Sequence, residues 1–308
     1  MPSLLFIAPP DPVEAMLATG ALNFALANQP GAALTVVCAP EAAPWFRAAP
    51  NLAAMHALER RAGLGAWINL ALKHARHPFD LALDLSGAPG GYAVHARRRI
   101  VRRTPRVLMH RAEEYAALLC ADAPLGPVIW LDAAAREAAA SIEGQALLVL
   151  APDARAAHGW PGDNYAAVAR RLAGGPLAEA RVVVLGDAAL TGPIVSSLDA
   201  DGVAALDLGG GLDALAAAAL MERAVFVLGT DAPLAHAAAA LNAPTLALYG
   251  ATDERVRAPH GKRVKTMRAH EFEAAVGLGA SEKSLLEALT VDQVEAAALD
   301  LLRAGGLR

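Results

Sequence analysis

The chain is poor in the residues that mark secreted, metal-clustered and nucleic-acid-binding proteins. Its 308 residues include two cysteines, Cys38 and Cys120, which are far apart and lack C-x-x-C spacing, so we expect neither a disulfide framework nor a zinc cluster. A net charge of −4 and a pI near 6.1 argue against nucleic acid as a partner, because binding phosphates requires a basic surface.

Long apolar runs are also missing. No segment reaches the roughly 18 uninterrupted apolar residues of a membrane-spanning helix. The N-terminal residues MPSLLFIAPPD have no basic segment ahead of their short apolar run, so they do not resemble a signal peptide. We therefore expect a cytoplasmic protein, one that can still contact the surface of a membrane.

Apolar residues make up 55% of the chain, and its length is usual for two domains. Buried strands alternate with helices, the pattern of a parallel sheet covered on both faces. The expected strands are 4–8, 34–38, 81–85, 146–150, 182–185, 204–208, 225–228 and 245–249. The expected helices are 13–28, 111–120, 164–172, 212–223, 233–241 and 291–302. With 132–145 as a connection, we predict two Rossmann-like domains, 1–140 and 141–308, and a last helix that can pack on either.

The most informative segment is 225–253, VFVLGTDAPLAHAAAALNAPTLALYGATD, which predicts strand, helix and strand. Asp231 and His236 lie between the carboxyl end of the first strand and the first helical turn. Ligands of open α/β sheets bind at that edge, and a helix N-terminus favours an anion. The alternatives are that Asp231 only caps the helix and that His236 is structural.

Six arginines fall within ten residues, from Arg97 to Arg106. Guanidinium groups suit phosphates and carboxylates, which they bond in pairs. No aromatic residue is interleaved, so single-stranded nucleic acid is not expected. The alternative is a solvated strand with Arg97 and Arg99 on one face and Arg98 on the other.

An aspartate after the first strand and the segments APDARAAHGWPGDNYAAVARRL, VVVLGD and GTDAPLAHAAAALNAPTLALYGATD resemble glycosyltransferase family 9, bacterial heptosyltransferases of lipopolysaccharide core synthesis. The matching positions of the last segment are Asp231, His236, Pro244, Gly250, Thr252 and Asp253. The resemblance implies a GT-B fold, in which two Rossmann-like domains with parallel sheets face each other across a cleft. It implies inverting transfer of a sugar, a heptose, without metal or cofactor, from an ADP-linked donor.

The resemblance also implies the partners and their residues. Asp11 would be the general base, although Asp before Pro12 is equally a helix cap, and Glu14 is a second carboxylate candidate. The donor would be held by Asp231, Leu234, His236, His158 and Thr252. An anionic lipid-linked saccharide would be bound by Arg97, Arg99, Arg102 and Arg103 at the cytoplasmic face of the inner membrane.

The sequence also departs from the family pattern: Pro10 and Pro233 stand where the family often has glycine, and His158 where it commonly has lysine. Proline has no N–H to offer a phosphate, and a neutral imidazole attracts a diphosphate less than an ammonium group does. These departures keep open a divergent member that binds a glycan, a nucleotide or a protein without catalysis. A nucleotide-sugar epimerase of the same fold is a further alternative, whereas the absence of G-x-G-x-x-G after the first strand argues against a nicotinamide oxidoreductase.

Overall fold

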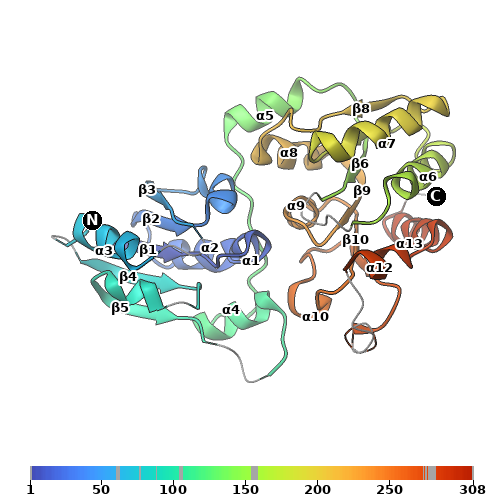
Figure 1. Cartoon of the computed structure of the whole chain (residues 1–308). Coiled ribbons are helices and arrows are strands. Elements are labelled where there is room, and N and C mark those ends of the chain that lie inside the picture. Colours follow the sequence, from blue (N-terminus) through green and yellow to red (C-terminus); the bar gives the residue numbers. More distant parts are fainter. Residues whose placement is uncertain are drawn as a thin grey trace. The chain divides into compact units, whose positions relative to one another are not determined.

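The computed structural model describes residues 2–59, 63–75, 78–87, 89–103, 107–153, 159–272, 274, 276 and 282–306. The chain forms two compact units (Figure 1). The first is Met1–Trp130 with Arg255–Arg257, and the second is Leu131–Glu254 with Ala258–Arg308. Among the described residues, no helix has the length and hydropathy needed to cross a membrane.

The first unit is built on a five-stranded parallel sheet with the strand order β3-β2-β1-β4-β5. Its strands are β1 (Ser3–Ile7), β2 (Ala33–Cys38), β3 (Leu52–Ala57), β4 (Phe79–Asp84) and β5 (Ala96–Val101). Its helices are α1 (Pro12–Leu17), α2 (Thr19–Ala27), α3 (Leu64–Lys73) and α4 (Arg111–Leu119), with 3-10 turns η1 (Pro40–Phe46) and η2 (Pro89–Ala93).

The chain reverses its direction across the first sheet between β1 and β4. From β1 it proceeds outward through β2 and β3, then returns to place β4 on the other side of β1, with Ile7 opposite Asp84. Ligands of open parallel sheets bind at the carboxyl ends of the strands at such a switch point. The residues that follow Ile7 and Asp84 are therefore placed where a substrate of this unit would lie.

The helix expected over 13–28 is instead two helices, α1 and α2, which meet at Ala18. The Thr19 hydroxyl donates to the carbonyl of Met16 at 2.7 Å and accepts the N–H of Val128 at 2.9 Å. A hydroxyl that bonds back to its own helix bends it. The neighbouring Gly20 has no room for a side chain, because a Cβ there would overlap the carbonyl of Gly126.

The second unit holds a six-stranded parallel sheet with the order β11-β10-β9-β6-β7-β8. Its strands are β6 (Leu147–Ala151), β7 (Arg181–Val184), β8 (Ala205–Asp207), β9 (Ala224–Thr230), β10 (Thr245–Leu248) and β11 (Val264–Met267). Its helices are α5 (Ala133–Ala140), α6 (Gly162–Ala173), α7 (Ala188–Ala200), α8 (Ala214–Leu220), α9 (Pro233–Ala240), α10 (Glu254–Arg257, shared with the first unit), α12 (Glu282–Glu287) and α13 (Val291–Ala304), with the 3-10 turn η3 (Met221–Arg223). Here the switch point lies between β6 and β9.

Continuous apolar strands form the core of the second unit, as expected for a sheet that is covered on both faces. Phe226 and Leu228 of β9 are fully buried in one cluster with residues of α6 and α13. The last helix, α13, therefore packs within this unit, against α6 and β11. Trp160 belongs to the same cluster, and its indole N–H donates to the carbonyl of Leu289 at 2.9 Å.

Helix α5 lies in the segment that the sequence suggested was only a connection. Asp132 caps it by accepting the N–H of Ala135 at 2.7 Å, and Ala135 and Ala139 are buried. Because the buried side is made of alanines, the segment lacks the large apolar residues that mark a core helix. α5 packs against α8 and belongs to the second unit, so the units divide after Trp130, earlier than the expected boundary at residue 140.

Candidate active site

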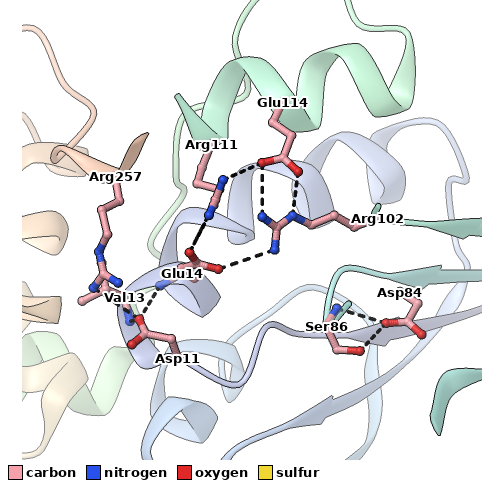
Figure 2. Close-up of polar contacts among 9 residues, drawn as sticks. All are labelled: Asp11, Val13, Glu14, Asp84, Ser86, Arg102, Arg111, Glu114 and Arg257. Carbon is pink, nitrogen blue, oxygen red and sulfur yellow. Dashed lines mark hydrogen bonds and ion pairs between the residues drawn. The ribbon is translucent and has the colours of Figure 1, made fainter. Parts of the chain in front are cut away.

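Asp11 follows β1 and caps α1 with its side chain (Figure 2). Its Oδ1 accepts the backbone N–H of Val13 at 3.0 Å and that of Glu14 at 3.1 Å. Nη2 of Arg257 forms an ion pair with the same oxygen at 3.3 Å. The helix cap, one of the two roles that the sequence suggested for Asp11, is thus present. Arg257, a cation that the sequence did not indicate, lies beside it.

The two oxygens of Asp11 have different surroundings. Two N–H groups and one guanidinium meet at Oδ1, whereas Oδ2 has no partner among the residues that the structure describes. The side chain is 28% exposed, so water or a substrate can reach it. A carboxylate that is fixed by one oxygen and open at the other can accept a proton without losing its place, which is what a general base requires.

Four charged side chains form a closed ring behind the first turn of α1 (Figure 2). Glu14 pairs with Arg111 at 2.8 Å, and Arg111 pairs with Glu114 at 2.8 Å. Glu114 pairs with Arg102 at 2.7 Å, and Arg102 closes the ring to Glu14 at 3.6 Å. All four are largely buried, with side chains 7% to 17% exposed.

Arg102, one of the residues predicted to bind the acceptor, is a member of this ionic ring. Burial opposes the charge of Arg102, but its hydrogen bond to Glu114 and the nearby acidic charges outweigh that effect, so the pKa of Arg102 is raised. The ring joins α1, α4 and the end of β5, and it fixes Glu14, three residues after Asp11. Glu14 therefore has two arginine partners and supports the position of Asp11.

The other arginines of the run have separate surroundings along β5 and just beyond it. Arg97 is exposed and pairs with Asp80 at 2.9 Å. The guanidinium of Arg99 donates to the carbonyls of Gly91 and Val94. Arg98 and Arg103 are exposed, and Arg106 lies outside the described residues. Within the described structure, Arg97, Arg99 and Arg102 thus each make contacts inside the first unit.

Asp84 is a second carboxyl group at the switch point, and the sequence analysis missed it. It ends β4 opposite Ile7 and is fully buried, with Oδ1 accepting the N–H of Ser86 at 3.0 Å and its hydroxyl at 2.6 Å (Figure 2). Burial raises the pKa of Asp84, while the bonds from Ser86 and the charge of Arg99 lower it less. The available signal was an aspartate near the end of an apolar strand.

Asp231 of the second unit accepts hydrogen bonds instead of capping α9. Nε2 of His236 lies 3.1 Å from its Oδ1, and the Tyr249 hydroxyl donates to the same oxygen at 3.4 Å. A carboxylate only accepts hydrogen bonds, so Nε2 carries the proton in this contact. His236 has no exposed surface, and in this structure its ring orients Asp231.

Three buried polar atoms at this edge of the second sheet are unsatisfied in the described structure. The hydroxyls of Thr230 and Thr252 and Nδ1 of His236 are buried without a hydrogen-bond partner among the described residues. Thr230 ends β9 and Thr252 follows β10, two adjacent strands beside the switch point. Buried polar atoms are nearly always bonded in native proteins, so such a group is expected where a ligand or water supplies the missing partners.

The N-terminus of α9 follows the same strand end. Ala232 is its N-cap and has no side-chain cap. The N–H groups of Ala235 and His236 already donate to the Ala232 carbonyl, so the N–H of Leu234 is the one left for another acceptor in this turn of the described structure. Pro233 occupies the first helical position and contributes no N–H, and Leu234 beside it is half-buried. His158, the other predicted donor residue, lies outside the described residues.

Arg268, which the sequence analysis did not single out, holds the loop after β10. Nη1 pairs with Glu254 at 2.6 Å, and Nη2 donates to the carbonyls of Gly250 and Thr252. The guanidinium thereby fixes the loop that carries Thr252.

Within the described part of the chain, no three histidine, cysteine, aspartate or glutamate side chains are grouped as metal ligands.

Comparison with known proteins gives one family and several structures. The model of glycosyltransferase family 9 (heptosyltransferase) matches residues 78–283 of the 308. A glycosyl transferase family 9 structure from Veillonella parvula aligns with a TM-score of 0.81 and 17% identity over 98% of each chain. No curated protein sequence matches.

Two Escherichia coli structures are also similar. ADP-heptose lps heptosyltransferase II aligns with a TM-score of 0.72 and 19% identity over 99% of each chain. A heptosyltransferase with ADP aligns with a TM-score of 0.71 and 17% identity, over 97% of this chain and 99% of that one. At these identities the likeness establishes the fold, and the expected GT-B fold of two Rossmann-like units is confirmed.

Proposed function

This chain belongs to glycosyltransferase family 9 and is a glycosyltransferase, and on that premise we propose that it moves a heptose from an ADP-linked donor to an anionic, lipid-linked saccharide. The transfer inverts the anomeric centre and uses neither metal nor cofactor. It takes place at the cytoplasmic face of the inner membrane. The observation that carries the proposal is the carboxylate of Asp11, fixed through Oδ1 and open at Oδ2, at the switch point of the first sheet.

The reaction is a single displacement. An acceptor hydroxyl attacks the anomeric carbon while the bond from that carbon to the β-phosphate oxygen breaks, and its electrons leave with the nucleoside diphosphate. The hydroxyl proton passes to Oδ2 of Asp11. Attack from the face opposite the leaving group gives the inverted product.

The second unit is suited to the donor. The leaving diphosphate gains negative charge, and the N-terminus of α9 offers it the N–H of Leu234 and a positive dipole end. The buried hydroxyls of Thr230 and Thr252 are further donors that lack partners in the described structure. Asp231, oriented by His236 and Tyr249, can accept hydrogen bonds from sugar hydroxyls.

The proposal is tested by measuring donor binding and turnover with the same protein. We expect ADP and ADP-heptose to raise the melting temperature, because a ligand that binds only the folded state stabilises it. The Asp231→Ala variant should lose most of that rise, and release of ADP should require the saccharide acceptor.

Other outcomes assign the alternatives. Binding without turnover for any acceptor would identify a non-catalytic member, in keeping with Pro233 at the first helical position. Conversion of a nucleotide sugar without an acceptor would identify an epimerase. No response to any nucleotide would overturn the donor assignment.

A further inference from the structure

Helix α3 of the first unit exposes large apolar side chains on one face. Ile68 is 46% exposed and Leu72 is 68% exposed, and residues four positions apart lie on the same side of a helix. The opposite side is anchored by Leu70, which is buried in a cluster with residues of β1, β2 and β4. The exposed side therefore has no partner within the described structure, although α3 itself is firmly packed.

The turn η2, which contacts α3, carries an exposed aromatic side chain. Tyr92 is 59% exposed, and the guanidinium of Arg99 lies over its ring at 5.2 Å. Arg99 also donates to the carbonyls of Gly91 and Val94, on either side of Tyr92. The tyrosine is thus held on a fixed turn, with an apolar ring and a polar hydroxyl, the combination that favours the interface of a bilayer with water.

Positive charge accompanies the apolar residues. Lys73 in the last turn of α3 is exposed. By sequence alone, Arg60 and Arg61 precede the helix and Arg76 follows it, with Glu59 as the one acidic residue between positions 59 and 76. Apolar side chains on a helix that is flanked by basic residues are typical of segments that lie on anionic membranes.

We propose that the α3–η2 face, defined by Ile68, Leu72, Lys73 and Tyr92, docks on the surface of an anionic bilayer. The proposal rests on the proposed function, because a lipid-linked acceptor has its lipid in that bilayer. Ile68, Leu72 and Tyr92 enter the interface between headgroups and acyl chains, and Lys73 contacts anionic headgroups. The sequence predicted that Arg99 binds the acceptor. In the structure its guanidinium supports Tyr92 from within the protein.

The test is co-sedimentation of the full chain with vesicles. Vesicles of phosphatidylglycerol and phosphatidylethanolamine should bind the protein, with affinity falling as salt rises, and phosphatidylcholine vesicles should bind it weakly. The double variant Ile68→Asn/Leu72→Asn should lose about tenfold in affinity for the anionic vesicles. Lys73→Gln should lower binding to anionic vesicles without changing binding to phosphatidylcholine.

A matched control is available in the second unit. Val276 is 62% exposed, so Val276→Asn removes an equally exposed apolar side chain and should leave vesicle binding unchanged. Melting curves of all variants establish that each is folded. Full binding by the folded double variant, or equal loss on Val276→Asn, would overturn the proposal. A dimer in light scattering that the double variant loses would assign the face to a second copy and also overturn it.

The two proposals fail separately. Transfer to a soluble acceptor that lacks its acyl chains tests the glycosyltransferase reaction without a membrane, and the double variant should retain it. Activity on that acceptor without vesicle binding would overturn the docking face alone. Vesicle binding without transfer to any acceptor would leave the docking face supported and overturn the proposed reaction.

Discussion

Nη2 of Arg257 lies 3.3 Å from Oδ1 of Asp11, the same oxygen that accepts two N–H groups of α1. The contact decides which oxygen of the carboxylate remains open. Arg257 is only 17% exposed, so the ion pair is partly shielded from water. Asp11 was expected as a site residue from the sequence, whereas Arg257 comes from a short helix late in the chain.

Replacing Asp11 by Asn should separate the base from the cap. Asparagine caps a helix about as well as aspartate, so the melting temperature should stay within a few degrees of the native value. It cannot take a proton from the acceptor, so kcat should fall about a hundredfold or more. Steady-state release of ADP and a melting curve measure both effects. An unchanged kcat would remove Asp11 from the role of base.

Arg257 is expected to act by positioning Asp11. Arg257→Ala should lower kcat about tenfold and leave the KM for the donor little changed, because only the orientation of the base is lost. Arg257→Lys restores a positive charge and should recover part of that rate, although lysine lacks the planar guanidinium. Equal rates for the Ala and Lys variants would show that the charge beside Oδ1 has no part in catalysis.

The ionic ring should matter far more for stability than the exposed ion pair of the same arginine run. Removing Glu114 leaves the largely buried positive charges of Arg102 and Arg111 without one of their carboxylate partners. Glu114→Ala should therefore lower the free energy of unfolding by about 3 kcal/mol. Arg97→Ala breaks a pair with Asp80 in which the arginine side chain is 71% exposed, and should cost less than about 1 kcal/mol. Denaturant unfolding compares the two, and equal losses would contradict the ring's role.

The arginine run shows what the sequence could and could not reveal. The strand and its alternation were foreseeable, since Arg97 and Arg99 lie on one face of β5 and Arg98 on the other. Which arginines would be neutralised was not, because their carboxylates come from elements elsewhere in the chain, Asp80 on β4 and Glu114 on α4. A local pattern records charge, whereas pairing depends on the tertiary fold.

The same distinction applies to the fold. Parallel strands such as β6 and β9 were predictable because buried strands are continuous apolar runs. The break at Ala18 was not, because it depends on Val128, which donates to Thr19 from a distant segment. The Asp231–His236 pair was predicted as a site, but the burial of His236 and its bond to Asp231 required coordinates.

Gly91 should be intolerant of a side chain. A Cβ at this position would overlap Oδ2 of Asp84 and crowd Ile7, and the turn is held from the other side by Arg99. We expect Gly91→Ala to cost about 1–3 kcal/mol, the usual range for overpacking. Denaturant unfolding measures the loss. Gly87→Ala is a poor control, because Gly87 has a positive φ of 71° that would strain an alanine by itself. Gly65→Ala serves better, since nothing lies within 4 Å of a Cβ there. A stable Gly91→Ala protein would show that η2 can move away from Asp84.

The pair His56 and His74 should make stability depend on pH. Their Nε2 atoms lie 3.2 Å apart, tying β3 to the end of α3, and the His74 ring packs on Phe79 with centroids 4.9 Å apart. Burial lowers the pKa of both histidines below the ordinary value of 6.5, with Lys73 adding to the effect and the charge of His74 acting on His56.

A depressed pKa in the folded state means that the unfolded chain binds protons first as the pH falls. The stability contributed by the neutral pair is therefore fully present above about pH 6.5 and is lost as the pH falls through the lowered pKa values. His74→Phe keeps an aromatic ring beside Phe79 but leaves His56 without the second imidazole, so it should flatten the decline of melting temperature between about pH 7 and pH 5. His95→Phe is the control, because His95 is exposed and lies outside the pair. If the His74→Phe and His95→Phe proteins lost stability as steeply as the native protein, the pH dependence would arise elsewhere, and the two rings would be only a packing contact between β3 and α3.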